Sequence, residues 1–154
     1  PLRLVGSEMC IRDSPKPLAL LGSGATPTAT RDELAAQKKQ LETLLPNTSL
    51  RSAQIEHLQG SHGLQAVPLI AAAAPEKRAP LSDVIPLCEA EISHAIQAEL
   101  ARSSTDVLAR RCRLAMVDFA EAQRLEPLTE KHLAQSGLDS AATSTSPMSH
   151  QLNP

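Results

Sequence analysis

Acidic and basic side chains alternate in the stretch ELARSSTDVLARRCRLAMVD, which covers residues 99–118 and has the residue types for ion pairing. An α-helix turns by about 100° per residue, so side chains three or four positions apart share a face. Asp106, Arg110 and Arg113 have these spacings and fall on one side of such a helix. We therefore expect a partly solvated ion-pair cluster there, in which each pair contributes roughly a few tenths of a kcal/mol.

Arg111 falls on the apolar stripe of the same expected helix, and Asp118 lies further along that stripe. A guanidinium in such a position either reaches water where the helix frays or is buried beside a carboxylate. We expect burial, with Asp118, Glu91 or Glu99 as the partner, and keep the frayed helix as the alternative. The structural ion-pair candidates are therefore Asp106, Arg110, Arg111, Arg113 and Asp118.

The histidines do not form a metal-binding pattern in the sequence. His57 and His62 are five residues apart. His94, His132 and His150 have no Cys or carboxylate at the spacing of metal ligands. We expect surface or packing histidines and no metal site. The glutamates just before His94 are more typical of a solvated helix face than of an acid–base pair.

The sequence indicates neither a nucleophile nor a phosphate-binding loop. Cys112 lies on an apolar helix face without a histidine nearby in the sequence, which favours an inert buried thiol. The segment Gly-Ser-Gly at residues 22–24 lacks a third glycine and a following amphipathic helix, so we interpret it as a flexible linker. We therefore assign no catalytic, cofactor-binding or metal-binding residue.

Apolar residues recur at helical spacing and predict an all-α fold, a small bundle of about five to six short helices with disordered ends. Because Phe119 is the only aromatic residue, the core must consist of Leu, Ile, Val and Ala. Thr30 and Glu33 form a capping-box pattern that predicts the start of the first helix. Further helices are predicted around Ile55 and Leu58, from Leu64 to Ala74, over residues 92–100 and 108–122, and from about Leu128 to Gln135.

Composition divides the chain into four parts. Residues 31–139 form the helical domain, residues 15–30 predict a linker, and residues 140–154 predict a disordered tail. The stretch LVGSEMCIRDS, which begins at Leu4, is similar to the translation of a transposase adapter used in sequencing libraries. We interpret residues 1–14 as an adapter-derived artefact that packs against nothing, and we expect the natural gene to continue upstream.

Charge and hydropathy exclude two classes of partner. The net charge is -2, and Lys and Arg are scattered among Asp and Glu, so nucleic acid is not an expected partner. The longest apolar run, residues 69–74, is far shorter than the roughly 20 residues that cross a bilayer. We expect no membrane span in this chain.

The stretch 99–118 resembles one near the C-terminus of FAD-dependent glycerol-3-phosphate dehydrogenases. In that family Asp-Val-Leu-Ala-Arg-Arg-Thr-Arg-Leu-Ala recurs, and Cys112 stands here in place of the Thr. Residues 90–92 are similar to the family's Ala-Glu-Val segment. Residues 57–63 resemble its His-Leu and Ser-Tyr-Gly elements, with His62 in place of the Tyr. The resemblance covers a little over half of the chain.

This resemblance implies that the chain is the helical C-terminal cap domain of such an enzyme, structural and not catalytic by itself. The parent family binds FAD in an N-terminal domain, oxidises glycerol 3-phosphate to dihydroxyacetone phosphate and passes electrons to quinone. The implied partner is the missing FAD-binding domain, and the fragment itself holds no cofactor. The parent enzyme would associate with the mitochondrial inner membrane or the bacterial cytoplasmic membrane. The alternative is a free-standing helical protein-interaction module.

Overall fold

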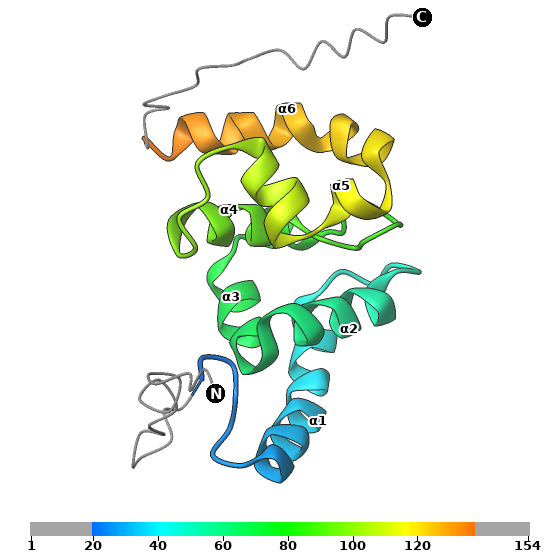
Figure 1. Ribbon diagram of the computed structural model, residues 1–154. Helices are drawn as coiled ribbons and strands as arrows, with labels where there is room; N and C mark the ends of the chain where they lie inside the picture. The colour runs from blue at the N-terminus through cyan, green and yellow to red at the C-terminus, as the bar shows by residue number, and fades with distance from the viewer. Residues whose placement is uncertain (1–19, 138–154) are drawn as a thin grey trace, which may run out of the picture.

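The computed structural model describes residues 20–137, and within this range helices are the only regular elements apart from one isolated bridge between Pro80 and Cys88. This confirms the predicted all-α fold (Figure 1). None of the described helices is long and apolar enough to cross a membrane. The helices are α1 (Pro27–Leu44), α2 (Arg51–His62), α3 (Ala66–Ala72), α4 (Glu89–Gln97), α5 (Leu114–Val117) and α6 (Phe119–Gln135), with short turns η1 (Gly63–Gln65), η2 (Pro75–Arg78) and η3 (Asp106–Arg111).

The buried apolar residues form two clusters. Helices α1 to α3 lie together at one end of the molecule, and α4 to α6 lie together at the other (Figure 1). Helix α4 belongs to both, because Ala90 packs in the first cluster and Ile92 in the second. The N-terminal cluster consists of Leu41, Leu45, Ile55, Leu58, Ala66, Ile70, Cys88 and Ala90. The C-terminal cluster consists of Leu87, Ile92, Ala95, Ile96, Ala101, Val107, Leu108, Leu114, Ala122 and Leu125.

The N-cap of helix α1 lies four residues before the predicted cap. Thr26 is the N-cap, and its side chain accepts a hydrogen bond from the backbone N–H of Ala29. Pro27 follows at the first helical position, where its missing N–H costs nothing. The predicted cap, Thr30, instead lies inside the helix and accepts from the backbone N–H of Gly24. The last four residues of the predicted linker 15–30 therefore belong to the helix.

The Gly-Ser-Gly segment is a packed turn and not a flexible linker. Gly22 has a φ of 81°, and its carbonyl accepts a hydrogen bond of 2.9 Å from the backbone N–H of Leu64. Gly63, at the C-cap of α2, has a φ of 55° and lies directly against Gly22. A side chain on either glycine would collide with the backbone of the facing segment. Through these two glycines the segment just before α1 packs against the end of α2.

Arg78, in the connection that follows α3, binds carbonyls at the ends of two helices, and no sequence pattern predicted this role. Its guanidinium donates to the Ala73 carbonyl at 2.6 Å and 3.0 Å and to the Leu44 carbonyl at 3.3 Å. The Arg78 carbonyl in turn accepts from the amide of Gln54, which is fully buried in α2. Because helix ends leave carbonyls unpaired, one arginine satisfies groups at the ends of α1 and α3.

The second half of the chain departs most from the predicted helices. The expected helix 108–122 is broken at Arg113, which adopts a left-handed conformation with a φ of 60°, and again at Asp118, which is extended. The expected last helix begins at Phe119 instead of Leu128 and continues through Pro127. It tolerates the proline because its buried stripe continues on both sides of it, at Ala122, Leu125, Thr129 and His132.

Candidate functional site

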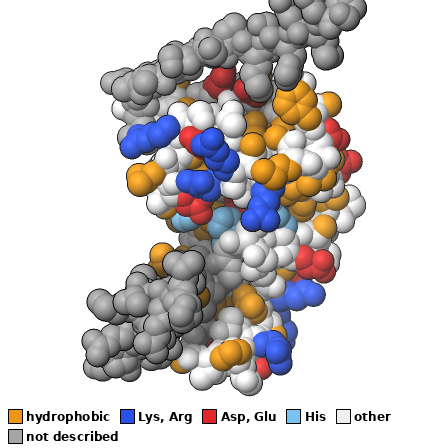
Figure 2. Space-filling view, viewed as in Figure 1, with side chains coloured by type: hydrophobic (Ala, Val, Ile, Leu, Met, Phe, Trp, Pro, Cys, Tyr) orange, Lys and Arg blue, Asp and Glu red, His pale blue; other side chains and the backbone are white. Residues whose placement is uncertain are grey.

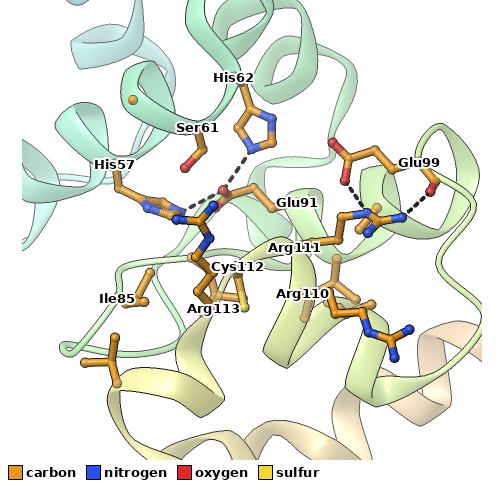
Figure 3. Close-up of a pocket in the computed structure, with 16 residues that line it drawn as sticks. His57, Ser61, His62, Ile85, Glu91, Glu99, Arg110, Arg111, Cys112 and Arg113 are labelled. Carbon is orange, nitrogen blue, oxygen red and sulfur yellow. Dashed lines mark hydrogen bonds and ion pairs between the residues drawn. The ribbon is translucent and has the colours of Figure 1, made fainter. Parts of the chain in front are cut away.

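A cleft of about 500 Å³ lies between the two clusters, and polar side chains from both halves of the molecule line it (Figure 3). In the space-filling view, histidine, glutamate and arginine side chains come together at the narrow waist of the molecule (Figure 2). Among the residues that line the cleft are His57, Ser61, His62, Glu91, Glu99, Arg110, Arg111, Cys112, Arg113 and Val117.

Glu91 is the centre of a buried hydrogen-bond network. One carboxylate oxygen, Oε1, accepts from Nε2 of His57 at 2.9 Å and from Nε2 of His62 at 3.1 Å (Figure 3). The other, Oε2, accepts from the backbone N–H of Cys88 at 2.9 Å. The two histidines lie on α2 and Glu91 lies on α4, so this one carboxylate joins the helices of the two clusters.

The network determines the protonation of Glu91. Burial by itself would raise the pKa of the Glu91 carboxyl, but the hydrogen bonds from His57 and His62 outweigh that effect and lower its pKa to about 2. Glu91 is therefore an anion at neutral pH and a poor general acid or base. Ser61 also lines the cleft, yet within the described range it forms no hydrogen bond with either histidine. Ser61 is therefore not paired with a base, whereas Oγ of Ser93 on α4 lies 3.5 Å from Nδ1 of His132, at the long limit of a hydrogen bond.

Arg111 pairs with one of its three predicted partners. Its Nε lies 3.2 Å from Oε2 of Glu99, and its Nη2 donates to the Glu99 carbonyl at 2.8 Å. The predicted burial was wrong, since the Arg111 side chain is 39% exposed at the edge of the cleft. Asp118 plays a different part, because its Oδ1 accepts from the backbone N–H of Glu121 and caps α6.

Asp106 and Arg110 form the predicted ion pair, with 2.6 Å between Oδ1 and Nη1. Asp106 also accepts from the backbone N–H groups of Arg102 and Ser103, and Ser103 caps the same turn in return. These contacts lower the pKa of the Asp106 carboxyl, with the Arg102 hydrogen bond as the largest cause. Arg113 does not join this cluster. It extends instead toward the side of the cleft that holds His57 (Figure 3).

Two more histidines have carboxylate partners that the sequence spacing did not reveal. Nε2 of His132 lies 2.9 Å from Oε2 of Glu89, 43 residues away. Nε2 of His94 lies 3.9 Å from Oε1 of Glu99. Neither pair has a ligand spacing within one helix, because the first pair spans two helices and the second crosses the end of α4.

Cys112 was predicted to be an inert thiol, and the structure describes a second buried thiol, Cys88. Burial raises the pKa of the Cys88 thiol to about 12, and the nearby Glu91 carboxylate adds to this. Burial likewise raises the pKa of Cys112, which is half-buried in the wall of the cleft. Because the thiolate is the reactive form, neither residue is activated as a nucleophile.

A patch of exposed apolar side chains, Met116, Val117 and Phe119, adjoins the cleft. Their exposed fractions are 73%, 66% and 67%. An unbroken helix over residues 108–122 would place Phe119 on the same face as the buried Leu108, but the breaks at Arg113 and Asp118 change the phase of the helix. Val117 lines the cleft as well, so the patch and the cleft form one continuous surface.

The family comparison agrees with the resemblance found in the motif. The model of the C-terminal domain of alpha-glycerophosphate oxidase matches residues 4–138. This range includes most of residues 1–14, which lie outside the described structure, and their adapter origin stays a prediction. No curated protein and no solved structure matches the chain. Because the family match extends over far more than half of the 154 residues, the chain belongs to the family of the C-terminal domain of alpha-glycerophosphate oxidase.

Proposed function

We propose that this chain serves as the C-terminal cap domain of an FAD-dependent enzyme that oxidises glycerol 3-phosphate to dihydroxyacetone phosphate. The family match over residues 4–138 carries the proposal. In this view the FAD-binding domain performs the chemistry, and the helical domain is structural. A mitochondrial or bacterial membrane location of the parent enzyme, with quinone as its electron acceptor, belongs to the same proposal.

The arrangement of side chains supports a structural role for this domain. The one buried carboxylate of the cleft, Glu91, is held as an anion by two histidines, and both described cysteines have raised pKa values. Groups held in this way stabilise a fold but do not transfer protons readily near neutral pH. The domain therefore contributes to stability and assembly of the enzyme.

The apolar patch is the surface that we assign to the FAD-binding domain. Met116, Val117 and Phe119 are large side chains that are each more than half exposed, which is costly if no partner covers them. Arg110 and Arg111 line the same cleft as Val117. An apolar centre with arginines at its rim is the composition of a protein–protein interface.

A chimera tests this function. An alpha-glycerophosphate oxidase whose own C-terminal domain is replaced by this chain should retain flavin and oxidise glycerol 3-phosphate faster than the same enzyme truncated before that domain. Changing Met116, Val117 and Phe119 together to Ser should reduce flavin retention toward that of the truncated enzyme. As a control, Val84→Ser alters another exposed apolar side chain, outside the patch, and should have no effect.

The isolated chain provides the complementary measurement. It should be colourless and should not oxidise glycerol 3-phosphate. A flavin absorption band that survives desalting would contradict the structural part assigned to it. A chimera that behaves like the truncated enzyme would instead favour a free-standing interaction module.

A further inference from the structure

Three side chains of metal-binding type converge at one end of the cleft. His62 is the last residue of α2, His94 lies on α4, and Glu99 follows α4. Each offers one ligand atom, and these atoms all lie within 4.8 Å of one another. Ligands around a tetrahedral Zn²⁺ ion, with bonds of about 2.0 to 2.1 Å, are roughly 3.4 Å apart. Small side-chain rotations would therefore bring the three atoms to coordination distance.

Two of the three groups are already oriented by a second partner. Nε2 of His62 bonds to Glu91, which leaves Nδ1, and this atom is turned toward Glu99 in Figure 3. Oε2 of Glu99 pairs with Arg111, which leaves Oε1, the atom nearest to His94. Metal-binding imidazoles and carboxylates are held by such outer contacts, which fix the ring orientation and the free lone pair.

The third group, His94, has a ring without a hydrogen bond to any other described residue. Its Nε2 lies 3.9 Å from Oε1 of Glu99, beyond hydrogen-bond distance. Its ring packs edge-on against the ring of His62, with the centroids 5.6 Å apart. A half-buried imidazole normally finds a hydrogen-bond partner, so the free nitrogen of His94 is available to a ligand.

We propose that His62, His94 and Glu99 bind a divalent transition-metal ion of the Zn²⁺ type. Two imidazoles and one carboxylate are a ligand set that this ion accepts, with the fourth position left to water or to a group in the cleft. All three side chains are half-buried, so the ion can enter from solvent. The carboxylates of Glu91 and Glu99 together offset the positive charge of Arg111 nearby.

The sequence alone predicted no metal site, and this proposal differs from that prediction. His62 belongs to the N-terminal half of the molecule and the other two ligands to the C-terminal half, so a bound ion would link α2 to α4 and the loop that follows it. The ligands are 32 and 37 residues from His62 in the chain, a separation that no short motif contains. The proposal does not depend on the function of the parent enzyme.

Cobalt absorption tests the site directly, because Co²⁺ bound in tetrahedral geometry by nitrogen and oxygen absorbs visible light. Titration of the full chain with Co²⁺ near pH 7.5 should saturate at one equivalent, and Zn²⁺ should then displace the Co²⁺. His94→Ala and Glu99→Gln should each weaken binding at least tenfold. Circular dichroism of both variants should show unchanged helix content, since neither side chain is fully buried.

Two matched controls make the result specific. His132→Ala removes a histidine that pairs with Glu89 elsewhere and should leave Co²⁺ binding unchanged. Cys112→Ser tests for a thiolate ligand from the cleft wall and should also leave binding unchanged. The proposal is overturned if no saturable binding occurs, or if His94→Ala and Glu99→Gln bind as tightly as the parent chain. Loss of binding in Cys112→Ser would equally overturn this ligand set.

Discussion

The N-terminal helices and the segment between Leu100 and Asp118 bury aliphatic side chains by different means. Helices α1 and α2 are regular, and their buried residues follow the helical period, as at Leu41, Ile55 and Leu58. The later segment combines a left-handed residue at Leu100, a π-helical turn over η3 and a second left-handed residue at Arg113. The motif that indicated the family lies in the irregular part.

The irregular geometry changes which side chains face the core. In η3 the backbone N–H of Cys112 bonds to the carbonyl of Val107, five residues earlier, instead of four. Such a turn contains one extra residue and shifts the phase of everything that follows it. Arg111 thereby moves off the apolar stripe to the edge of the cleft, where it meets Glu99. In this chain the π-helical turn therefore exposes an arginine that a regular helix would bury.

Core truncations in both regions should have the largest effects. Leu58→Ala in the N-terminal cluster and Leu114→Ala in the C-terminal cluster each remove a fully buried side chain and should lower the free energy of unfolding by about 2 to 5 kcal/mol. Because α4 contributes to both clusters, we expect a single unfolding transition in each variant. Calorimetry checks this, and two separate transitions would show that the regions are independent domains.

Loss of the carboxylate that joins the regions should cost nearly as much. Glu91→Ala leaves two histidine N–H groups and the Cys88 N–H without an acceptor, so we expect a destabilisation of about 3 kcal/mol in chemical denaturation. Glu56→Ala on α2 removes an exposed glutamate and should stay within about 0.5 kcal/mol. Equal effects of the two substitutions would contradict the network.

Stability should also depend on pH through Glu91. The folded-state pKa of Glu91, about 2, lies below the ordinary glutamate value of 4.5, so the stabilisation is present above pH 4.5 and is lost as the pH falls toward 2. The difference corresponds to about 3 kcal/mol. Urea unfolding between pH 7 and pH 2.5 measures it. In the Glu91→Gln variant this part of the dependence should disappear; an unchanged slope would assign it to other carboxylates.

The glycine contact should have an intermediate effect. Gly63→Ala places a methyl group against the backbone of Gly22 at a positive φ and should destabilise the fold by about 1 to 3 kcal/mol. Gly60→Ala, within α2 and with open space around it, should instead stabilise by about 0.5 to 1 kcal/mol. Thermal unfolding of the two variants compares them. The same sign for both would indicate that the Gly22 turn does not pack on α2.

The smallest effects should come from the exposed ion pair. Arg110 is 67% exposed, so Arg110→Ala should change the free energy of unfolding by roughly 0.5 kcal/mol or less. Asp106→Ala removes a cap from two backbone N–H groups and should cost about 1 kcal/mol. Denaturant titration of both variants separates capping from ion pairing. A larger loss for Arg110→Ala would show that the charge pair dominates.

Sequence patterns predicted the fold class and the elements that depend on neighbours in the chain. The helical spacing of aliphatic residues was sufficient to predict α1 and α2. The ion pair of Asp106 and Arg110 followed from their separation by four residues. Helix starts were less accurate, because Thr26 and Thr30 are both good caps and only the approach of Gly24 to Thr30 distinguishes them. The family motif was likewise visible without a structure.

The polar centre of the molecule was decided by the tertiary structure alone. His57 and Glu91 are 34 residues apart, and no local rule connects them. Their contact requires that α2 and α4 meet across the cleft, and the pattern of neither helix specifies that meeting. The amino-acid sequence therefore determined which helices form, because hydrophobic period and capping are local, whereas partners across the cleft depend on how those helices pack.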